Sequence, residues 1–444
     1  MAKKSLLERA INSDFAGKVG IPQGEPLRRY TPGEPLLDGP VVVGGNGRLA
    51  EGIRNLLEKD YQLLAGEADT KRSAIVFDAT NITKPEDLHE LFDFFNPQMR
   101  KLLPSGRIVV IGTTPELVDD VDARVVARSL EGFSRSVAKE LRRGATGQLV
   151  YVDPSSGADT LAGLESTLRF LFSGKSAFVD GQVIRVGTEQ PDTTADWDQP
   201  LAGRLAVVTG AARGIGETIA EVLHRDGADV ICVDVPAAGE GLADTANRVS
   251  GTALPLDVTD PKAAETIAKH AQERHGRPVQ IIVHNAGVTR DKLLANMNEG
   301  QWKMVQNINL VAPLRITQAL LENGGLAADA AVVGVSSMAG ISGNRGQTNY
   351  ATTKAGIIGM VDSLSERMSQ GGGTINAVAP GFIETAMTAA MPTGPREMGR
   401  RLSTLAQGGQ PVDVAETVAY FAAPASRAVH GNTVRVCGQN MMGA

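Results

Sequence analysis

The chain has 444 residues, with 44 Lys and Arg against 50 Asp and Glu, so its formal net charge is −6. This length predicts two to four domains, and 42% hydrophobic against 21% charged residues is typical of a globular chain. The near balance of charge and the scarcity of aromatic residues, 4%, argue against a nucleic-acid partner.

Cysteine, histidine and apolar patterns exclude further classes. The only two cysteines, Cys232 and Cys437, exclude a disulfide scaffold and indicate a reducing compartment, so we expect a cytoplasmic protein. Residues 1–13 lack the apolar stretch of a signal peptide, and no run approaches the roughly 20 apolar residues of a membrane-spanning helix. The six histidines show no metal-ligand spacing, so we expect no metal site.

Four segments follow one another along the chain. Residues 1–40 begin with a short amphipathic pattern, Ser5 to Asn12, and then carry five prolines, which predicts an irregular segment. Residues 41–187 and 204–444 both alternate Val/Ile-rich runs with helical patterns, which is typical of an α/β fold with a parallel sheet. Residues 188–203 are rich in Pro, Asp and Thr and are predicted to be a linker.

The block 204–444 predicts a doubly wound parallel sheet of the Rossmann type. Its first strand, 205–208, leads into a glycine-rich turn and a helix that ends near Gly227. Further strands are predicted at 230–233, 253–256, 280–284, 331–335, 374–378 and 433–436.

The block 41–187 is a shorter relative of the later block. Residues 106–114 parallel 330–337, and 176–186 parallel 426–436, which indicates duplication of one fold. Between the first strand and its next clear neighbour lie 33 residues, Val41 to Ala74, where the later block has 74, Val207 to Ile281. A strand–helix–strand stretch is therefore missing, which favours a flavodoxin-like order for this smaller domain.

The turn after residue 209 is a candidate dinucleotide site. Gly210, Gly214 and Gly216 permit a tight turn and close approach of a pyrophosphate to a helix N-terminus. Asp234 ends the next strand, where a carboxylate accepts hydrogen bonds from ribose hydroxyls and repels a 2′-phosphate. This favours NAD(H) over NADP(H), although Arg213 in the turn argues for a 2′-phosphate. An ordinary turn and a helix-capping acid are the alternatives.

Polar residues after the third and fourth strands extend this candidate site. Asp257 and Val258 could meet the adenine edge, and Asn285-Ala286-Gly287 ends the fourth strand. Asn309 lies inside a predicted helix, where a buried Asn is either a structural kink or part of a water chain.

Ser337, Tyr350 and Lys354 are the candidate catalytic set. Tyr350 and Lys354 are four residues apart and so share a helix face, where an ammonium favours the phenolate and lowers the pKa of the phenol. Such a Tyr can act as a general acid or base near neutral pH, and Ser337, after an apolar strand, can hydrogen-bond the same carbonyl oxygen. The alternative is an ordinary surface Tyr–Lys pair.

These residues make 204–440 resemble the short-chain dehydrogenase/reductase family, and most of all its 3-oxoacyl-acyl-carrier-protein reductases. The motifs are Thr209-Gly-Ala-Ala-Arg-Gly-Ile-Gly216, Asn285-Ala-Gly287, Ser336-Ser337, Asn349-Tyr-Ala-Thr-Thr-Lys354 and Val378-Ala-Pro-Gly-Phe-Ile-Glu-Thr385. The block in front further resembles the high-molecular-weight subgroup, whose members carry a flavodoxin-like domain and are described as NADH-dependent.

The resemblance implies a role for each matching residue. Tyr350 would protonate the substrate oxygen, Lys354 would bind the nicotinamide ribose, Ser337 would orient the ketone and Asn309 would hold a water. Residues 384–411 would form the substrate flap. The implied cofactor-binding residues are Gly210, Arg213, Gly214, Ile215, Gly216, Asp234, Asp257, Val258, Asn285, Ala286, Gly287, Tyr350, Lys354, Pro380, Gly381, Ile383 and Thr385.

The resemblance therefore implies NADH-dependent reduction of 3-oxoacyl thioesters, carried by CoA or acyl-carrier protein, in a homodimer. The alternatives are a related enzyme for another carbonyl or alcohol, such as a hydroxysteroid or quinone, and a non-catalytic NAD-binding sensor or scaffold. One departure concerns the cofactor, because acyl-carrier reductases usually prefer NADP(H) and lack an acid at the Asp234 position.

The other departure concerns the earlier block, which has no catalytic set. Ala123 and Ala127 stand opposite Tyr350 and Lys354, and Thr114 opposite Ser337. Its turn, residues 44–47, is predicted to be structural or to serve docking rather than to cradle a phosphate. Three arginines, predicted to be exposed, either are solvated or contact a partner or a CoA phosphate; they are Arg107, Arg124 and Arg128.

Overall fold

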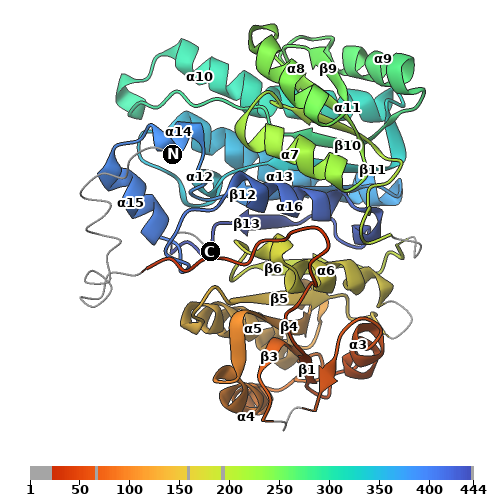
Figure 1. The fold of residues 1–444 in the computed structure, drawn as a ribbon, viewed down its shortest axis with the longest axis vertical. Helices are drawn as coiled ribbons and strands as arrows, with labels where there is room; N and C mark the ends of the chain where they lie inside the picture. Colours follow the sequence, from red (N-terminus) through yellow and green to blue (C-terminus); the bar gives the residue numbers. More distant parts are fainter. Residues whose placement is uncertain (1–22, 66–68, 158–160, 192–195, 442–444) are drawn as a thin grey trace.

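A computed structural model describes residues 23–65, 69–157, 161–191 and 196–441 (Figure 1). The predicted helix Ser5 to Asn12 and residues 192–195 of the predicted linker lie outside the described residues. Residues 23–40 contain no helix or strand, as expected for an irregular segment. Throughout the described ranges, no helix combines the length and apolar character that crossing a membrane requires.

The N-terminal half, residues 41–187, is built on six parallel strands in the order β2-β1-β3-β4-β5-β6. Its first five strands follow the flavodoxin-like order, as predicted. The sequence pattern missed β2 because it is only two residues long. The strands are β1 Val41–Gly44, β2 Leu63–Leu64, β3 Arg72–Asp78, β4 Leu102–Thr113, β5 Thr146–Val152 and β6 Val183–Val186.

Helices cover both faces of this sheet (Figure 1). The α-helices are α3 Ala50–Leu57, α4 His89–Met99, α5 Val121–Glu140 and α6 Ala162–Phe172. Short 3₁₀ turns join them, η1 Pro85–Leu88, η2 Pro115–Leu117 and η4 Gly174–Ser176. Most residues of β1, β3, β4 and β5 are buried, because helices cover the sheet on both sides.

The C-terminal half, residues 204–441, contains seven parallel strands in the order β13-β12-β11-β10-β7-β8-β9, which confirms the Rossmann-type sheet. The strand order reverses at β7 and β10, and open α/β sheets bind their ligands at such a reversal, beyond the carboxyl ends of the strands. The strands are β7 Leu205–Thr209, β8 Asp229–Asp234, β9 Thr252–Pro255, β10 Val279–His284, β11 Leu326–Val335, β12 Thr374–Pro380 and β13 Thr433–Val436.

The helices of this half carry several residues of the candidate site, among them Tyr350 and Lys354 on α13. A π-helical segment, η7 Asn307–Val311, joins α10 to α11. The α-helices are α7 Gly214–Arg225, α8 Gly239–Arg248, α9 Ala263–His275, α10 Glu299–Gln306, α11 Ala312–Glu322, α12 Met338–Ser342, α13 Thr348–Gln370, α14 Ala386–Ala389, α15 Thr393–Arg401 and α16 Pro411–Ala422.

The two halves meet through the elements that the sequence repeats, α6 and β6 against α16 and β13 (Figure 1). Phe170 and Tyr420, 250 positions apart, stack on each other with ring centroids 4.3 Å apart. The backbone N–H of Arg185 donates to the Asn432 side chain at 2.8 Å. The same contact, displaced by 250 positions, runs from the Arg435 N–H to Gln182 at 3.0 Å. The duplicated units are therefore related by a local two-fold axis.

The irregular residues 23–40, here called the strap, run along both halves (Figure 1). The guanidinium of Arg29 donates two hydrogen bonds of 2.9 Å to the buried carboxylate of Asp413, at the start of α16. The Gln407 side chain donates to the carbonyl of Glu25 at 2.6 Å. The strap thus ties the beginning of the chain to the segment that joins α15 to α16.

Candidate active site

The glycine turn between β7 and α7 brings the backbone close to a helix N-terminus. Gly210 and Gly214 have φ of 70° and 66°, a conformation that favours glycine. A side chain at Gly216 would overlap the carbonyl of Gly210, whereas one at Gly214 would meet nothing within 4 Å. The open backbone at Gly214 and the tight packing beneath it fit a pyrophosphate at the positive end of α7. The residues Arg213 and Ile215 flank this opening.

Asp234 stands beside this turn at the end of β8. One carboxylate oxygen accepts the N–H of Ala212 at 3.0 Å, and the other accepts the N–H of Val235 at 2.8 Å. These bonds hold a negative charge next to Arg213, which is exposed. Sequence reasoning missed a second carboxylate, Glu217, which accepts the N–H of Gly214 at 3.0 Å. A glutamate in the first turn of a predicted helix is the sequence feature from which this contact could have been predicted.

The strand-end residues divide into two groups. Asn285 donates to the carbonyls of Thr209 and Gly210, at 2.9 and 3.2 Å, and so joins the end of β10 to the glycine turn. Asp257 is not brought into this network, because it accepts both the N–H and the hydroxyl of Thr259 and caps its own turn. Its neighbour Val258 is buried.

Asn309 occupies the middle of η7, where the α-helical pattern is interrupted. It is 1% exposed, and its amide makes reciprocal bonds with the backbone of Val288, at 2.9 and 3.0 Å. The amide nitrogen also lies 3.3 Å from the Thr353 hydroxyl, on α13. The π-helical turn therefore aims Asn309 at α13, and π-helical turns are frequent at functional sites.

Ser337, Tyr350 and Lys354 converge at the end of β11. Ser337 caps α12, accepting the N–H of Ala339 at 3.2 Å, and it lies close enough to the phenol of Tyr350 to affect its pKa. Lys354 lies one turn after Tyr350 on α13, is 4% exposed and donates to the carbonyl of Val335 at 2.7 Å. A side chain placed on Gly287 would contact both Asn309 and Lys354, so these two predicted catalytic residues lie beside the end of β10.

The pKa of Tyr350 differs from the sequence prediction. Burial raises it above its usual value near 10, and the nearby Ser337 hydroxyl only partly offsets this. The predicted lowering by the Lys354 ammonium is wrong for this arrangement, since the nitrogen lies 5.6 Å from the ring centroid and faces Val335. Burial lowers the pKa of Lys354 to about 8.

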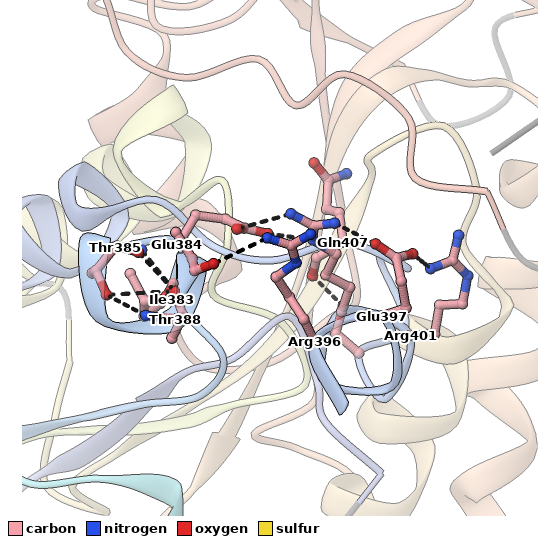
Figure 2. Close-up of polar contacts among 11 residues, drawn as sticks. Ile383, Glu384, Thr385, Thr388, Arg396, Glu397, Arg401 and Gln407 are labelled. Atoms are coloured by element: carbon pink, nitrogen blue, oxygen red, sulfur yellow. Dashed lines mark hydrogen bonds and ion pairs between the residues drawn. The ribbon is translucent and has the colours of Figure 1, made fainter. Parts of the chain in front are cut away.

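The segment after β12 carries four of the predicted cofactor residues. Pro380 ends the strand, Gly381 donates to the carbonyl of Val436 at 2.9 Å, and Ile383 is buried. Thr385 caps α14, with Thr388 completing the capping box (Figure 2). All four predicted cofactor residues of this segment therefore lie in one short stretch.

Ion pairs hold the predicted flap, residues 384–411 (Figure 2). The guanidinium of Arg400 donates twice to Glu384, at 2.5 and 3.0 Å, and so joins α15 to the segment before α14. The buried Glu397 accepts from both Arg400 and Arg401. The predicted flap therefore contains two short helices, α14 and α15, and the ion pairs of Arg400 and Arg401 with Glu384 and Glu397.

The corresponding place in the N-terminal half is filled by the chain itself. Asp78, at the end of β3, accepts the N–H of Leu49 at 2.8 Å, so a carboxylate already occupies the N-terminus of α3. A side chain on Gly47 would overlap that carboxylate. The guanidinium of Arg48 fills the adjoining space, bound to Thr113 and to the carbonyls of Asp153 and Ser156 at 2.9–3.0 Å.

The predicted exposed arginines of this half take three different positions. Arg107 is 2% exposed, so the prediction of a solvated charge is wrong there; its apolar stem lies in the sheet β3–β4–β5 and its guanidinium meets Thr146 at 3.3 Å. Arg124 donates to the carbonyl of Pro115 at 3.0 Å. Arg128 is exposed on α5.

Comparison with known proteins covers the C-terminal half. The family model described as Enoyl-(Acyl carrier protein) reductase matches residues 210–438, just over half of the chain. The 3-oxoacyl-(acyl-carrier-protein) reductase FabG of Pseudomonas aeruginosa is 41% identical over 241 residues, which are 54% of this chain and 97% of that protein. Proteins of the same name from Vibrio cholerae and Thermotoga maritima are 38% and 36% identical, over 97% and 98% of their lengths and 54% of this chain.

The family match, residues 210–438, contains the glycine turn and the residues Ser337, Tyr350 and Lys354 of the C-terminal half. The N-terminal half lies outside these matches. The chain belongs to the short-chain dehydrogenase/reductase family of oxidoreductases.

Proposed function

We propose that this protein reduces 3-oxoacyl thioesters to 3-hydroxyacyl thioesters with NADH, as a step of fatty-acid metabolism. The observation that carries the proposal is the convergence of Ser337, Tyr350 and Lys354 at the end of β11. Its relatives at 36–41% identity are 3-oxoacyl-acyl-carrier-protein reductases. When bound, the nicotinamide supplies the hydride that the reduction of a ketone requires.

Each residue of the catalytic set either transfers a proton or orients the substrate or the cofactor. The Tyr350 hydroxyl donates its proton to the ketone oxygen as C3 is reduced, and Ser337 holds that oxygen by a hydrogen bond. Lys354, one helical turn away, carries a buried ammonium that can donate to a ribose hydroxyl. Asn309 positions a water from which the phenolate regains a proton.

Asp234 supports NADH as the cofactor. Two backbone N–H groups fix its carboxylate beside the glycine turn, where it would accept ribose hydroxyls and repel a 2′-phosphate. Arg213 is the only cationic residue among residues 209–216. Its presence leaves the Asp234 carboxylate where it would meet the ribose hydroxyls. The glycine turn, Asp234 and Asn285 would hold the adenosine side, and Ile383 and Thr385 the nicotinamide side.

The name of each relative identifies its substrate as a 3-oxoacyl-acyl-carrier protein, whereas the family model is described by enoyl reduction. We favour the ketone because a serine and a tyrosine hydroxyl directed at one oxygen suit a carbonyl group. Acyl-CoA and acyl-carrier protein present the same 3-oxoacyl thioester, and we propose both as substrates.

We further propose that the protein is a cytoplasmic homodimer. Both cysteines are buried and unpaired, which suits a reducing compartment. The face made by α16 and β13 is covered by α6 and β6 of the same chain, so it is not free to join a second copy. A two-fold contact must therefore use another face of the C-terminal half.

The test is the initial rate of acetoacetyl-CoA reduction at 340 nm, with NADH and NADPH in parallel. We expect turnover with NADH, a loss of about 10²–10⁴-fold in kcat/KM for Tyr350→Phe, and little change for Thr352→Ala, an exposed position of the same helix. Asp234→Asn should lower kcat/KM for NADH and raise it for NADPH.

Two results would contradict the proposal. Reduction of crotonyl-CoA in preference to acetoacetyl-CoA would show that the protein is an enoyl thioester reductase. Cofactor binding without turnover of any thioester, with Tyr350→Phe indistinguishable from the wild type, would favour another carbonyl substrate or a sensing role. NADPH preference in the wild type would overturn only the cofactor assignment.

A further inference from the structure

Residues 402–410 connect α15 to α16 at the end of the predicted flap and are here called the hinge. The hinge forms a short parallel bridge with the segment after β12, between Ile383 and Gly409. The N–H of Glu384 donates to the carbonyl of Gly409 at 2.8 Å, and the N–H of Gly409 donates to the carbonyl of Phe382 at 3.0 Å. The position of Ile383, a proposed contact of the nicotinamide, therefore depends on the hinge.

The hinge has a backbone conformation that its own residues do not favour. Ala406 is 7% exposed and has a φ of 53°, in the left-handed region that an alanine adopts only where its surroundings hold it. The N–H of Thr404 donates to the carbonyl of Gly438 at 2.9 Å, and a side chain on Gly409 would overlap the ring of Phe178. Contacts from distant parts of the chain thus shape the hinge.

The strap supplies a further contact of this kind. A side chain on Gly24 would lie 2.9 Å from the Cβ of Gln407 and 3.0 Å from the carbonyl oxygen of Ala406, so the strap backbone lies directly against the hinge. The carbonyl of Glu25 accepts from the Gln407 side chain at 2.6 Å. The first described residues of the strap therefore cover the hinge at its left-handed residue.

Arg29 joins the strap to the other end of the hinge. Its guanidinium donates two hydrogen bonds of 2.9 Å to the carboxylate of Asp413, which is 2% exposed. The Oδ2 atom of Asp413 also accepts the N–H of Gln410, the last residue of the hinge, at 2.6 Å. Because a buried carboxylate is costly without its cation, this ion pair holds the strap, the start of α16 and the end of the hinge together.

Tyr30 attaches the next part of the strap to the molecule without the help of Arg29. Two cations lie over its ring, with the Lys175 ammonium 4.7 Å and the Arg225 guanidinium carbon 5.0 Å from the ring centroid. Gly174 lies so close to the backbone of Arg29 and Tyr30 that a side chain there would overlap it. A change at Arg29 should therefore free the strap at the hinge and leave the rest of the strap in place.

We propose that Arg29 is a positioning residue of the cofactor site and acts on it through the hinge. While the strap is bound, a continuous series of hydrogen bonds runs from Arg29 through Asp413 and the hinge to Glu384, and Ile383 stays where it would meet the nicotinamide. The inference rests on the proposed nicotinamide site. It concerns the nicotinamide side alone, since Asp234 on the adenosine side is held by hydrogen bonds of its own.

The first test measures amide hydrogen exchange in the full chain without a ligand. In Arg29→Gln we expect exchange within residues 382–410 to become faster by about fivefold or more, because the hinge loses a support, and exchange in the glycine turn, 209–216, to stay as in the wild type. Arg204→Gln is the matched control. It removes an ion pair of 2.5 Å with Asp329, at the amino end of β7, and should leave exchange in 382–410 unchanged.

The second test compares the binding of NADH, followed by fluorescence, with that of ADP, which lacks the nicotinamide half and is followed by calorimetry. We expect Arg29→Gln to weaken NADH binding by about fivefold or more, the lower end of typical coupling between separate sites, and to leave ADP affinity unchanged. In turnover, KM for NADH should rise while kcat changes little. Arg29→Lys keeps the charge and should restore part of the NADH affinity.

If Arg29→Gln does not fold, Gly24→Val replaces it, because a side chain there separates the strap from the hinge without leaving a buried charge unpaired. NADH affinity and exchange of 382–410 that match the wild type in the strap variants would overturn the proposal. Equal losses of NADH and ADP affinity would also overturn it, since they would indicate general destabilisation. Exchange and binding require no turnover, so a failure to reduce thioesters would contradict the proposed function alone.

Discussion

Asp180 is a carboxylic acid without exposed surface, located just before β6. One of its oxygens accepts the N–H of Gly147 at 2.9 Å, and the other has no hydrogen-bond partner among the described residues. Burial raises the pKa of Asp180 to about 8. At neutral pH the folded protein therefore holds a proton that the unfolded chain releases near pH 3.8.

This proton makes the stability depend on pH. Between about pH 4 and pH 8 the folded state binds more protons than the unfolded state, so the contribution of Asp180 to the free energy of unfolding falls as pH rises, by up to about 1.4 kcal/mol per unit. Asp180→Asn resembles the protonated acid and has no proton to lose. We expect its stability relative to the wild type to increase steadily from pH 4 to pH 8, measured by urea unfolding.

Asp119→Asn, at an exposed position of the same half, is the control and should leave the pH profile unchanged. A constant difference between Asp180→Asn and the wild type over this pH range would mean that the carboxyl group is already ionised at pH 4. The same logic with opposite sign applies to His284, whose pKa burial lowers to about 4, so that its contribution is lost as pH falls from about 6.5.

Single residues were predictable where their chemistry follows from spacing. The four-residue interval between Tyr350 and Lys354 placed both on one helix face, as the structure has them. The pKa of Tyr350 was not predictable in this way, because burial depends on residues far away in the sequence. The prediction that Arg107 is exposed was wrong for the same reason, because the sequence around Arg107 does not reveal the adjacent strands that cover it.

Among the elements, the turn from β1 to α3 shows how a dinucleotide-type turn becomes structural. Asp78 is 1% exposed and accepts the N–H groups of Leu49 and Thr80, at 2.8 and 3.0 Å. In the C-terminal half Asn285 follows the corresponding strand and donates to the carbonyls of Thr209 and Gly210, and the carboxylate at the N-terminus of α7 comes from Glu217 of the helix itself. The neighbouring strand thus supplies a carboxylate to the turn of the N-terminal half and an amide to the turn of the C-terminal half.

We expect Asp78→Ala to lower the free energy of unfolding by about 3 kcal/mol or more, because it leaves two buried N–H groups without partners at roughly 1–3 kcal/mol each. Asp120→Ala removes an exposed cap of α5, with its bond of 2.9 Å to the N–H of Ala123, and should cost only about 1 kcal/mol. Chemical unfolding of the two variants gives the comparison. Equal losses would show that burial adds nothing to the Asp78 cap.

Helices and strands were predictable from the periodicity of apolar residues, provided that they were longer than a few residues. Six later strands of the C-terminal half lie within a few residues of the predicted ranges. The two-residue β2 was missed because its signal is shorter than one period of strand alternation. The interruption at η7 showed only as an unfavourable Asn309 in a helical pattern, which does not by itself specify a π-helical turn.

At the scale of the whole molecule, one apolar core passes through both halves. Leu168, Phe172 and Phe178 belong to the same buried cluster as Val418 and Val429. The sequence repeat at a spacing near 250 indicated duplication but not that the copies pack on each other, since nothing in either copy identifies its neighbour. Because a local two-fold axis relates the two units, each unit contributes the same elements to the contact, as in a symmetric dimer.

This geometry predicts the behaviour of the C-terminal half alone. A chain of residues 200–444 exposes α16 and β13, and a second copy can cover them in the way that α6 and β6 do in the full protein. We expect light scattering to find twice as many subunits per particle as for the full chain. Tyr420→Asp should return the shortened chain to the smaller particle, because it places a charge where two rings stack. A shortened chain that stays in the smaller particle without this substitution would show that α6 and β6 cover the face in a way that a second copy does not reproduce.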